Sequence, residues 1–215
     1  SYNKVIGTSL DEKLYLAFRI LDYALLSAPG APITKALLEA GIGKDISGSY
    51  DSSTYQPIFS IVAKNANEEQ KAEFVKVIED TLKGIVENGM DKKALEAGIN
   101  YHEFRYREAD FGGYPKGLMY GLQIFDSWLY DDNAAFLLLE TQDAMDELYK
   151  KAEGSYFEQL IKECLIDNSF GVVAMAVPKV GLDAENEEKT AEKLRVYKDS
   201  LSKEEIEKIV RHTKE

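Results

Sequence analysis

Cysteine and histidine are almost absent from this chain, which has one cysteine, Cys164, and two histidines, His102 and His212. A single cysteine excludes an internal disulfide, so the fold must be held by its apolar core. Cys164 lies in an apolar-periodic segment, 156–166, which favours a buried small hydrophobic side chain over a reactive thiol. Scarce cysteine also fits a reducing compartment, the cytoplasm or an organelle matrix, rather than secretion.

Long hydrophobic runs and an excess of basic residues are also missing. No apolar stretch approaches the roughly 18 residues of a membrane span, and no secretory signal is visible. Asp and Glu number 38 against 26 Lys and Arg, which gives a net charge of -12. Because binding to a phosphate backbone needs clustered Lys and Arg, we expect neither a nucleic-acid partner nor a membrane partner. The 45% of hydrophobic residues is enough for a globular core.

The histidine content bears directly on metal chemistry. A catalytic zinc site needs about three protein ligands, often two histidines four residues apart on one helix face. His102-Glu103 begins like the motif His-Glu-x-x-His, but position 106 is Tyr. With Glu103 and Glu108 nearby a metal site is conceivable but poor, and a packing or surface histidine is the favoured interpretation. We therefore predict no catalytic, cofactor-binding or metal-binding residue in this chain.

Three further patterns have structural explanations. The glycine-rich segment 112–117 lacks the spacing of a phosphate-binding loop and predicts a tight turn between helices. Tyr101, Phe104 and Tyr106 follow helical spacing, which favours core packing over a binding surface. The serines of the segment 47–53 have no histidine placed as a partner, so the sequence offers no serine nucleophile.

Apolar periodicity and capping residues predict the order of elements. Helix starts are expected at Ser9, with Glu12 completing a capping box, at Asn67 with Gln70, and at Asp91. The predicted strands are 2–8, 45–51, 55–64 and 170–177, the second a polar edge strand and the last a continuous apolar run. The predicted helices are 9–26, 33–40, 67–88, 91–108, 117–130, 143–152 and 155–166.

This order predicts an α+β fold, a two-layer α/β domain with helices on one face of a mostly antiparallel sheet, over residues 1–178. Residues 179–215 are densely charged and predict a C-terminal helical extension, with a capping box at Ser202 and Glu205. The sequence starts with Ser1 rather than Met, and its helical pattern reaches Glu215 without a stop signal. We therefore expect a fragment of a longer polypeptide.

Four separated segments resemble the presequence-protease branch of the insulinase or pitrilysin family of zinc metallopeptidases. They are 28–43 (APGAPITKALLEAGIG), 100–108 (NYHEFRYRE), 113–118 (GYPKGL) and 128–131 (WLYD). Relatives usually have Arg where this chain has Lys116, which is a mild departure. The inverted zinc motif of that family, His-x-x-Glu-His, is absent from this sequence.

The resemblance implies the non-catalytic second domain of a four-domain zinc metalloendopeptidase that degrades unfolded oligopeptides. It places zinc in the first domain of the parent protein, and none in this segment. The partners implied are the catalytic domain, the C-terminal half and unfolded peptide, with residues 179–215 starting the helical linker between the two halves. Two alternatives remain: a peptide-binding module that uses the edge strand 45–51, and an inactive scaffold with the same fold.

The scarcity of histidine generates a prediction about metal content. We expect the purified chain to carry no stoichiometric zinc, because His102 and His212 are far apart and no cysteine pair exists. Metal analysis by mass spectrometry measures this directly. One zinc per chain that disappears in His102→Ala would contradict the prediction.

Overall fold

A computed structural model describes residues 1–109 and 111–214 of the chain. The described chain divides into two compact units, Ser1–Met175 and Ala176–Glu215. The assignment of 1–178 to one domain and 179–215 to the start of a linker hairpin stays a prediction, and its last residue, Glu215, lies outside the described residues.

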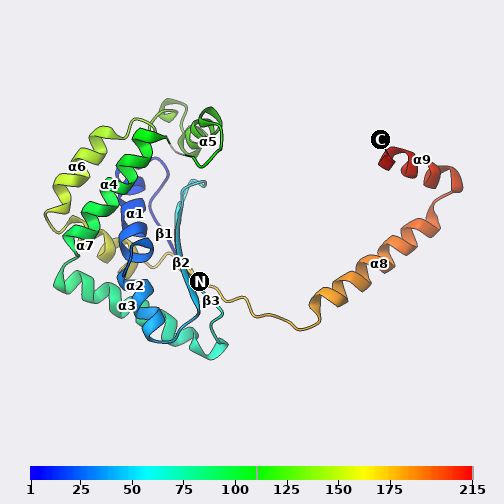
Figure 1. The fold of residues 1–215 in the computed structure, drawn as a ribbon, viewed down its shortest axis with the longest axis horizontal. Coiled ribbons are helices and arrows are strands. Elements are labelled where there is room, and N and C mark those ends of the chain that lie inside the picture. The colour runs from blue at the N-terminus through cyan, green and yellow to red at the C-terminus, as the bar shows by residue number, and fades with distance from the viewer. Residues whose placement is uncertain (110, 215) are drawn as a thin grey trace. The chain divides into compact units, whose positions relative to one another are not determined.

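The first unit contains a four-stranded sheet in the order β2-β3-β1-β4 with every neighbouring pair antiparallel. The strands are β1 (Tyr2–Val5), β2 (Asp45–Asp51), β3 (Ile58–Lys64) and β4 (Gly171–Val173). Tyr2 of β1 lies opposite Ile61 of β3 and Val173 of β4, which fixes the register. The helices of this unit cover one face of the sheet (Figure 1), as the fold class predicts. Segment 45–51 forms an edge strand, so that expectation is confirmed.

Helix α1 (Glu12–Asp22) lies at the centre of the core and continues into a π-helical segment, η1 (Tyr23–Ser27). Its side chains are buried on nearly all sides, as their apolar pattern predicts. They include Tyr15, Leu16, Ala17, Phe18, Ile20 and Leu21. The predicted start at Ser9 is wrong: Asp11 caps the helix and its side chain accepts from the Leu14 amide at 2.9 Å. Ser9 instead donates its backbone N–H to the carbonyl of Tyr55, which commits it to the preceding loop.

Three further helices begin or end at signals that the sequence contains. They are α2 (Pro32–Glu39), α3 (Lys71–Asn88) and α4 (Lys92–Glu108). The capping box of Asn67 and Gln70 is present at the short 3₁₀ turn η2 (Glu68–Gln70) before α3. Asp91 caps α4 by accepting from the Lys93 amide at 2.9 Å. These start sites are therefore confirmed, because a cap depends on contacts within a few residues.

The rest of the helical layer follows after the turn at Gly112 and Gly113, which the glycine-rich segment predicts. It comprises α5 (Lys116–Trp128), η3 (Asp132–Ala134), α6 (Gln142–Ala152), α7 (Tyr156–Leu160) and a π-helical end, η4 (Ile161–Ile166). The buried carboxylate of Glu158 in α7 accepts from the Met90 amide at 2.8 Å and joins α7 to the start of α4.

Strand β4 departs most from its predicted form. The continuous apolar run 170–177 predicts a long buried strand, but only Gly171–Val173 pairs in the sheet. In the antiparallel register Val173 lies opposite Tyr2, the first residue of β1. The residues after Ala174 therefore run past the start of β1, and a strand extends only as far as its neighbour can supply hydrogen bonds. Val172 pairs with Asn3 on the sheet face opposite the helices and is exposed there, and Phe170 is exposed just before the strand.

The second unit contains α8 (Leu182–Ser200) and α9 (Lys203–Lys214). Ser202 and Glu205 form the predicted capping box, with the Ser202 amide donating to the Glu205 carboxylate at 2.8 Å. No helix in the part of the chain that the structure describes is long and apolar enough to cross a membrane.

The close approach of β2 to η1 generates a stability prediction. A Cβ at Gly48 would lie 2.6 Å from the Asp22 carboxylate and 3.1 Å from the Leu26 Cβ. We expect Gly48→Ala to lower the free energy of unfolding by about 1–3 kcal/mol, because the buried contact leaves no room for a methyl group.

Gly84→Ala is the matched control, since nothing lies within 4 Å of a Cβ at that helical position. Alanine is the better helix former by about 1 kcal/mol, so this variant should be slightly more stable than the parent sequence. Urea denaturation of both variants gives the comparison, and equal stability of the two would refute the packing argument.

Candidate functional site

His102, the strongest candidate ligand in the sequence, is a packing residue of α4. Its side chain is 9% exposed, and its Nε2 lies 2.9 Å from the carbonyl oxygen of Arg19 on α1. Because a carbonyl only accepts, Nε2 carries the proton and donates. This bond joins α4 to the central helix and occupies the nitrogen that a metal would need on that side.

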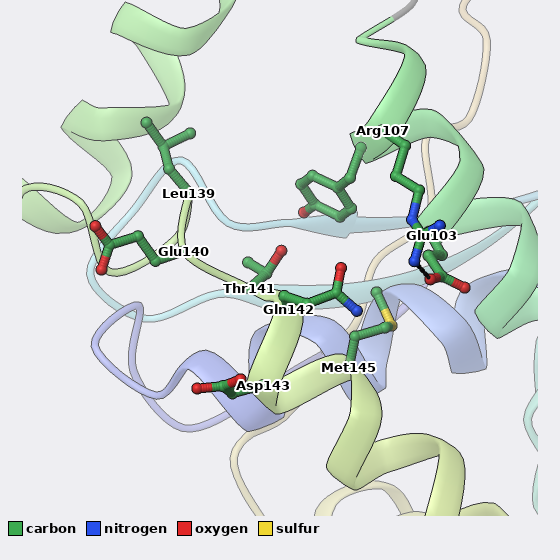
Figure 2. Close-up of a pocket in the computed structure, with 9 residues that line it drawn as sticks. Glu103, Arg107, Leu139, Glu140, Thr141, Gln142, Asp143 and Met145 are labelled. Carbon is green, nitrogen blue, oxygen red and sulfur yellow. Dashed lines mark ion pairs between the residues drawn. The ribbon is translucent and has the colours of Figure 1, made fainter.

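The two acidic neighbours of His102 do not complete a metal site. Glu103 forms an ion pair with Arg107 one turn along α4, and Figure 2 shows this pair at the rim of a surface hollow. Glu108 is exposed near the end of the helix. Within residues 1–109 and 111–214, no group of three or more His, Cys, Asp or Glu side chains could hold a metal ion.

The hollow in Figure 2 lies between the end of α4 and the segment that enters α6. It measures about 350 Å³, and its polar groups include the carboxylates of Glu103, Glu140 and Asp143 with the hydroxyl of Thr141. Glu103 is paired with Arg107, and within the described residues these carboxylates form no cluster of three that could hold a metal ion. The polar lining of this hollow is that of a solvent-filled surface groove.

Nucleophilic side chains elsewhere are tied into structural roles. Ser52 donates to the Asp126 carboxylate at 3.1 Å, and Ser53 donates to Asp51 at 2.6 Å. Cys164 is partly buried against the core, and burial raises the pKa of its thiol. A thiol that stays protonated is a weak nucleophile, which agrees with the structural interpretation of this cysteine.

The aromatic cluster of α4 differs from its prediction. Tyr106 packs against the core, but Tyr101 is 42% exposed and Phe104 is 63% exposed. The core-packing interpretation is therefore wrong for these two, because the helix turns them away from α1. Tyr101 instead stacks on Tyr23 of η1, with ring centroids 4.8 Å apart.

The sequence-based search missed the exposed apolar face of α5. Leu118, Leu122, Phe125 and Leu129 recur at four, seven and eleven residues, and each is at least 45% exposed. Trp128 stacks on Phe125 beside them, with ring centroids 5.8 Å apart. The spacing alone predicts an amphipathic helix, but sequence cannot tell whether its apolar face meets the domain core or something else. Large exposed apolar patches of this kind mark interaction surfaces.

A second candidate surface is the outer edge of β2. Within the described residues this strand pairs with β3 on one side only, so its other side has no strand partner in that part of the chain. Asp45 and Asp51 stand at its two ends, and the Ser47–Ser49 stretch between them is small and polar. Such an edge has the geometry to accept one further extended strand.

Burial of His102 generates a prediction about pH. Burial lowers the pKa of His102 to about 4, and the charges of Arg19 and Arg105 act in the same direction against the hydrogen bond to the Arg19 carbonyl. An unfolded histidine titrates near pH 6.5, so the unfolded chain binds the additional proton as the pH falls below that value. The contribution of neutral His102 to stability is thus complete above pH 6.5 and is lost towards pH 4.

Comparison with the variant His102→Gln isolates the contribution of His102 to the pH dependence of stability. Burial raises the pKa of Asp22 to about 6, which acts in the opposite sense, but Asp22 is present in both proteins. Between pH 7 and 4 we expect the parent sequence to lose up to about 3 kcal/mol more than the variant in urea denaturation. The exposed His212→Gln is the control and should follow the parent sequence; parallel pH profiles for all three would disprove the burial argument.

Comparison with known proteins places these surfaces in context. Residues 5–101 match a family model described as "Peptidase M16 inactive domain". Protein HypA from Clostridium perfringens is 42% identical over 217 residues, which cover 100% of this chain and 22% of that protein. Presequence protease 1, chloroplastic/mitochondrial, from Arabidopsis thaliana is 32% identical over 211 residues, which cover 96% of this chain and 19% of that protein. The chain therefore spans about a fifth of the length of these curated relatives.

Solved structures agree at the level of the fold. A candidate zinc protease from Bordetella pertussis superposes with a TM-score of 0.62 at 11% identity, covering 83% of this chain and 92% of that one. An inactive peptidase domain from Bordetella parapertussis gives 0.61 at 10% identity, covering 83% and 91%. Residues 5–101 are thus similar to the M16 inactive domain, the chain as a whole is similar to these two relatives, and its fold is that of the two Bordetella structures.

Proposed function

We propose that this chain is the non-catalytic domain of a larger zinc metalloendopeptidase that degrades unfolded oligopeptides. The observation that carries the proposal is similarity along the whole chain to proteins about five times longer, one of them named a presequence protease. In the proposed protein another domain holds the zinc, because the buried, hydrogen-bonded His102 of this chain does not fit a ligand role. The chain contributes structure and no catalytic residue.

The helices of the first unit cover only one face of the sheet, and the uncovered face supports a role as a wall of the substrate chamber. On the face opposite the helices, Ser49 of β2 lies across from Ser60 of β3, whose hydroxyl donates to Asn3 of β1 at 2.9 Å. This polar row runs across three strands, and the same face exposes Ile58 and Val172, so it can meet both polar and apolar parts of an unfolded peptide. A surface of this kind limits access by shape more than by side-chain type.

The apolar face of α5 supports contact with the remainder of the polypeptide. Transfer of apolar side chains from water to an apolar contact is favourable by about 25 cal/mol for each Å² buried. This applies to the exposed Leu118, Leu122 and Phe125. In the proposed protein they pack on the catalytic domain or on the C-terminal half.

Domain limits and location complete the proposal. Residues 1–178 form the domain, and 179–215 begin the helical linker between the two halves. The compartment is the cytoplasm of a bacterium or an organelle matrix. Two relatives support this range: one is bacterial, and the other is named chloroplastic/mitochondrial.

A second function is favoured by the free edge of β2. The chain could act alone as a peptide-binding or scaffold module without proteolysis, by adding an extended peptide to Asp45–Asp51. Titration of an unstructured peptide into the isolated chain separates the two proposals. Saturable binding by the isolated chain, together with an inactive longer protein, would favour the module.

Cleavage of a long unstructured peptide tests the main proposal. We expect no turnover by the isolated chain, and chelator-sensitive turnover by the longer protein that contains it. Turnover by the isolated chain that a chelator abolishes would refute the proposal.

The α5 surface can be tested in the same assay. We expect Leu122→Glu to lower cleavage by the longer protein several-fold, because a charge would be buried in the contact. In the isolated chain Leu122 is 54% exposed, so its melting temperature should hardly change. Leu38→Glu on α2, where the side chain is 48% exposed, is the matched control and should leave cleavage unchanged. Equal activity of both variants would remove α5 from the interface.

A further inference from the structure

A second, smaller hollow lies between α1, α4 and α5, away from the sheet edge and the exposed face of α5. It measures about 60 Å³, roughly the space of two water molecules or one carboxylate group. Its polar lining is formed by Arg19, His102, Arg105 and Gln123. Two cationic side chains thus face one small space.

Arg19 is the unusual member of this lining. It projects from the central helix, and its guanidinium carbon lies 4.5 Å from the ring centroid of Tyr15. Its Nε is buried without a hydrogen-bond partner. In the described part of the chain its side chain forms no ion pair with Asp22 or Asp126. Burial raises the pKa of both carboxylates, and the charge of Arg19 acts against that rise. A buried Nε–H without an acceptor costs free energy.

The other polar groups leave the space open to an anion. His102 is engaged with the Arg19 carbonyl, and Gln123 donates its amide to the Leu138 carbonyl at 2.6 Å. Arg105 is exposed, and among the described residues its one hydrogen bond is a long one, 3.4 Å, to the Tyr101 hydroxyl. The cationic donors that line the hollow are therefore those of the two arginines, beside the hydroxyls of Tyr106 and Tyr120.

The walls restrict what the guest can be. Phe111 and Tyr120 meet edge to face with centroids 5.4 Å apart, and Tyr106 continues this aromatic side. A planar carboxylate matches the fork of a guanidinium and can accept two parallel hydrogen bonds. Aromatic walls suit the apolar atoms attached to a carboxylate better than the hydrated oxygens of a phosphate.

We infer that this hollow binds a carboxylate group, held by Arg19 and Arg105, and that its natural source is the C-terminal end of a peptide. The carboxylate chemistry rests on the lining alone, whereas the peptide source rests on the proposed function. The C-terminal carboxylate of an unfolded peptide is small enough to enter the hollow, and it can reach the mouth while this domain stays folded.

The two histidines of the chain provide a direct assay. In the complete 215-residue chain labelled with ¹⁵N-histidine, the ring signals of His102 report on the hollow, and those of His212 on α9 serve as the internal control. The probes are N-acetyl-dialanine with a free carboxylate, the same peptide as its C-terminal amide, sodium acetate and sodium phosphate, at constant ionic strength. We expect a saturable shift of His102 with the free acid and none with the amide.

Two substitutions test the arginines. Arg19→Gln should weaken binding of the free acid by about tenfold or more, since a charge-assisted hydrogen bond is lost. The exposed Arg105→Gln should also weaken it, and this variant keeps the test decisive if Arg19→Gln fails to fold. Arg195→Gln on α8, where the side chain pairs with Glu192, is the control and should bind as the parent sequence does.

The outcomes separate the parts of the inference. No saturable shift with any probe, or equal binding by Arg105→Gln and the parent sequence, would overturn the site. Tighter binding of phosphate would overturn the carboxylate assignment, and acetate binding as tightly as the peptide would overturn the peptide source. Cleavage by the longer protein is a separate measurement, so failure of the proposed function would be recognised independently.

Discussion

The structure depends on one constraint, which is that α1 is buried on nearly all its sides. Phe18 and Leu21 meet the sheet and the surrounding helices with no exposed surface, so each neighbouring element must pack against this helix. A polar group on such a helix must find its partner locally. The Arg19 carbonyl does so by accepting from His102, while the Nε of the Arg19 side chain stays buried without a hydrogen-bond partner.

Concentrating the helices around α1 leaves two surfaces without cover inside the first unit. The sheet face that carries Ser49 and Ser60 receives none of this unit's helices, and α5 turns Leu122 and Phe125 outwards. The two surfaces differ in chemistry, since the first combines the polar row of Ser49 and Ser60 with the exposed Ile58 and Val172, whereas the second is apolar throughout. This contrast is why we propose the first for transient peptide contact and the second for permanent contact within a larger protein.

Local signals in the sequence were reliable where both partners of an interaction lie within a few residues. Asn67 with Gln70, Asp91, and Ser202 with Glu205 mark helix starts in the sequence, and each is a cap in the structure. The exception was Ser9, which has the right residue type for a cap but donates its backbone N–H to the distant Tyr55 carbonyl. A tertiary hydrogen bond there moved the helix start to Asp11.

By itself the sequence predicted the order of the elements and the mostly antiparallel α+β class, because these depend on short-range periodicity, whereas the resemblance to insulinase-type peptidases rests on four separated segments. Tertiary structure decided how far β4 extends, because strand length depends on the hydrogen bonds that β1 can supply. It also decided that His102 is buried and that the apolar face of α5 is exposed. The burial of His102 and the exposure of the α5 face depend on which part of the fold packs against each helix. Helical periodicity predicts which residues share a face, but it does not predict what packs on that face.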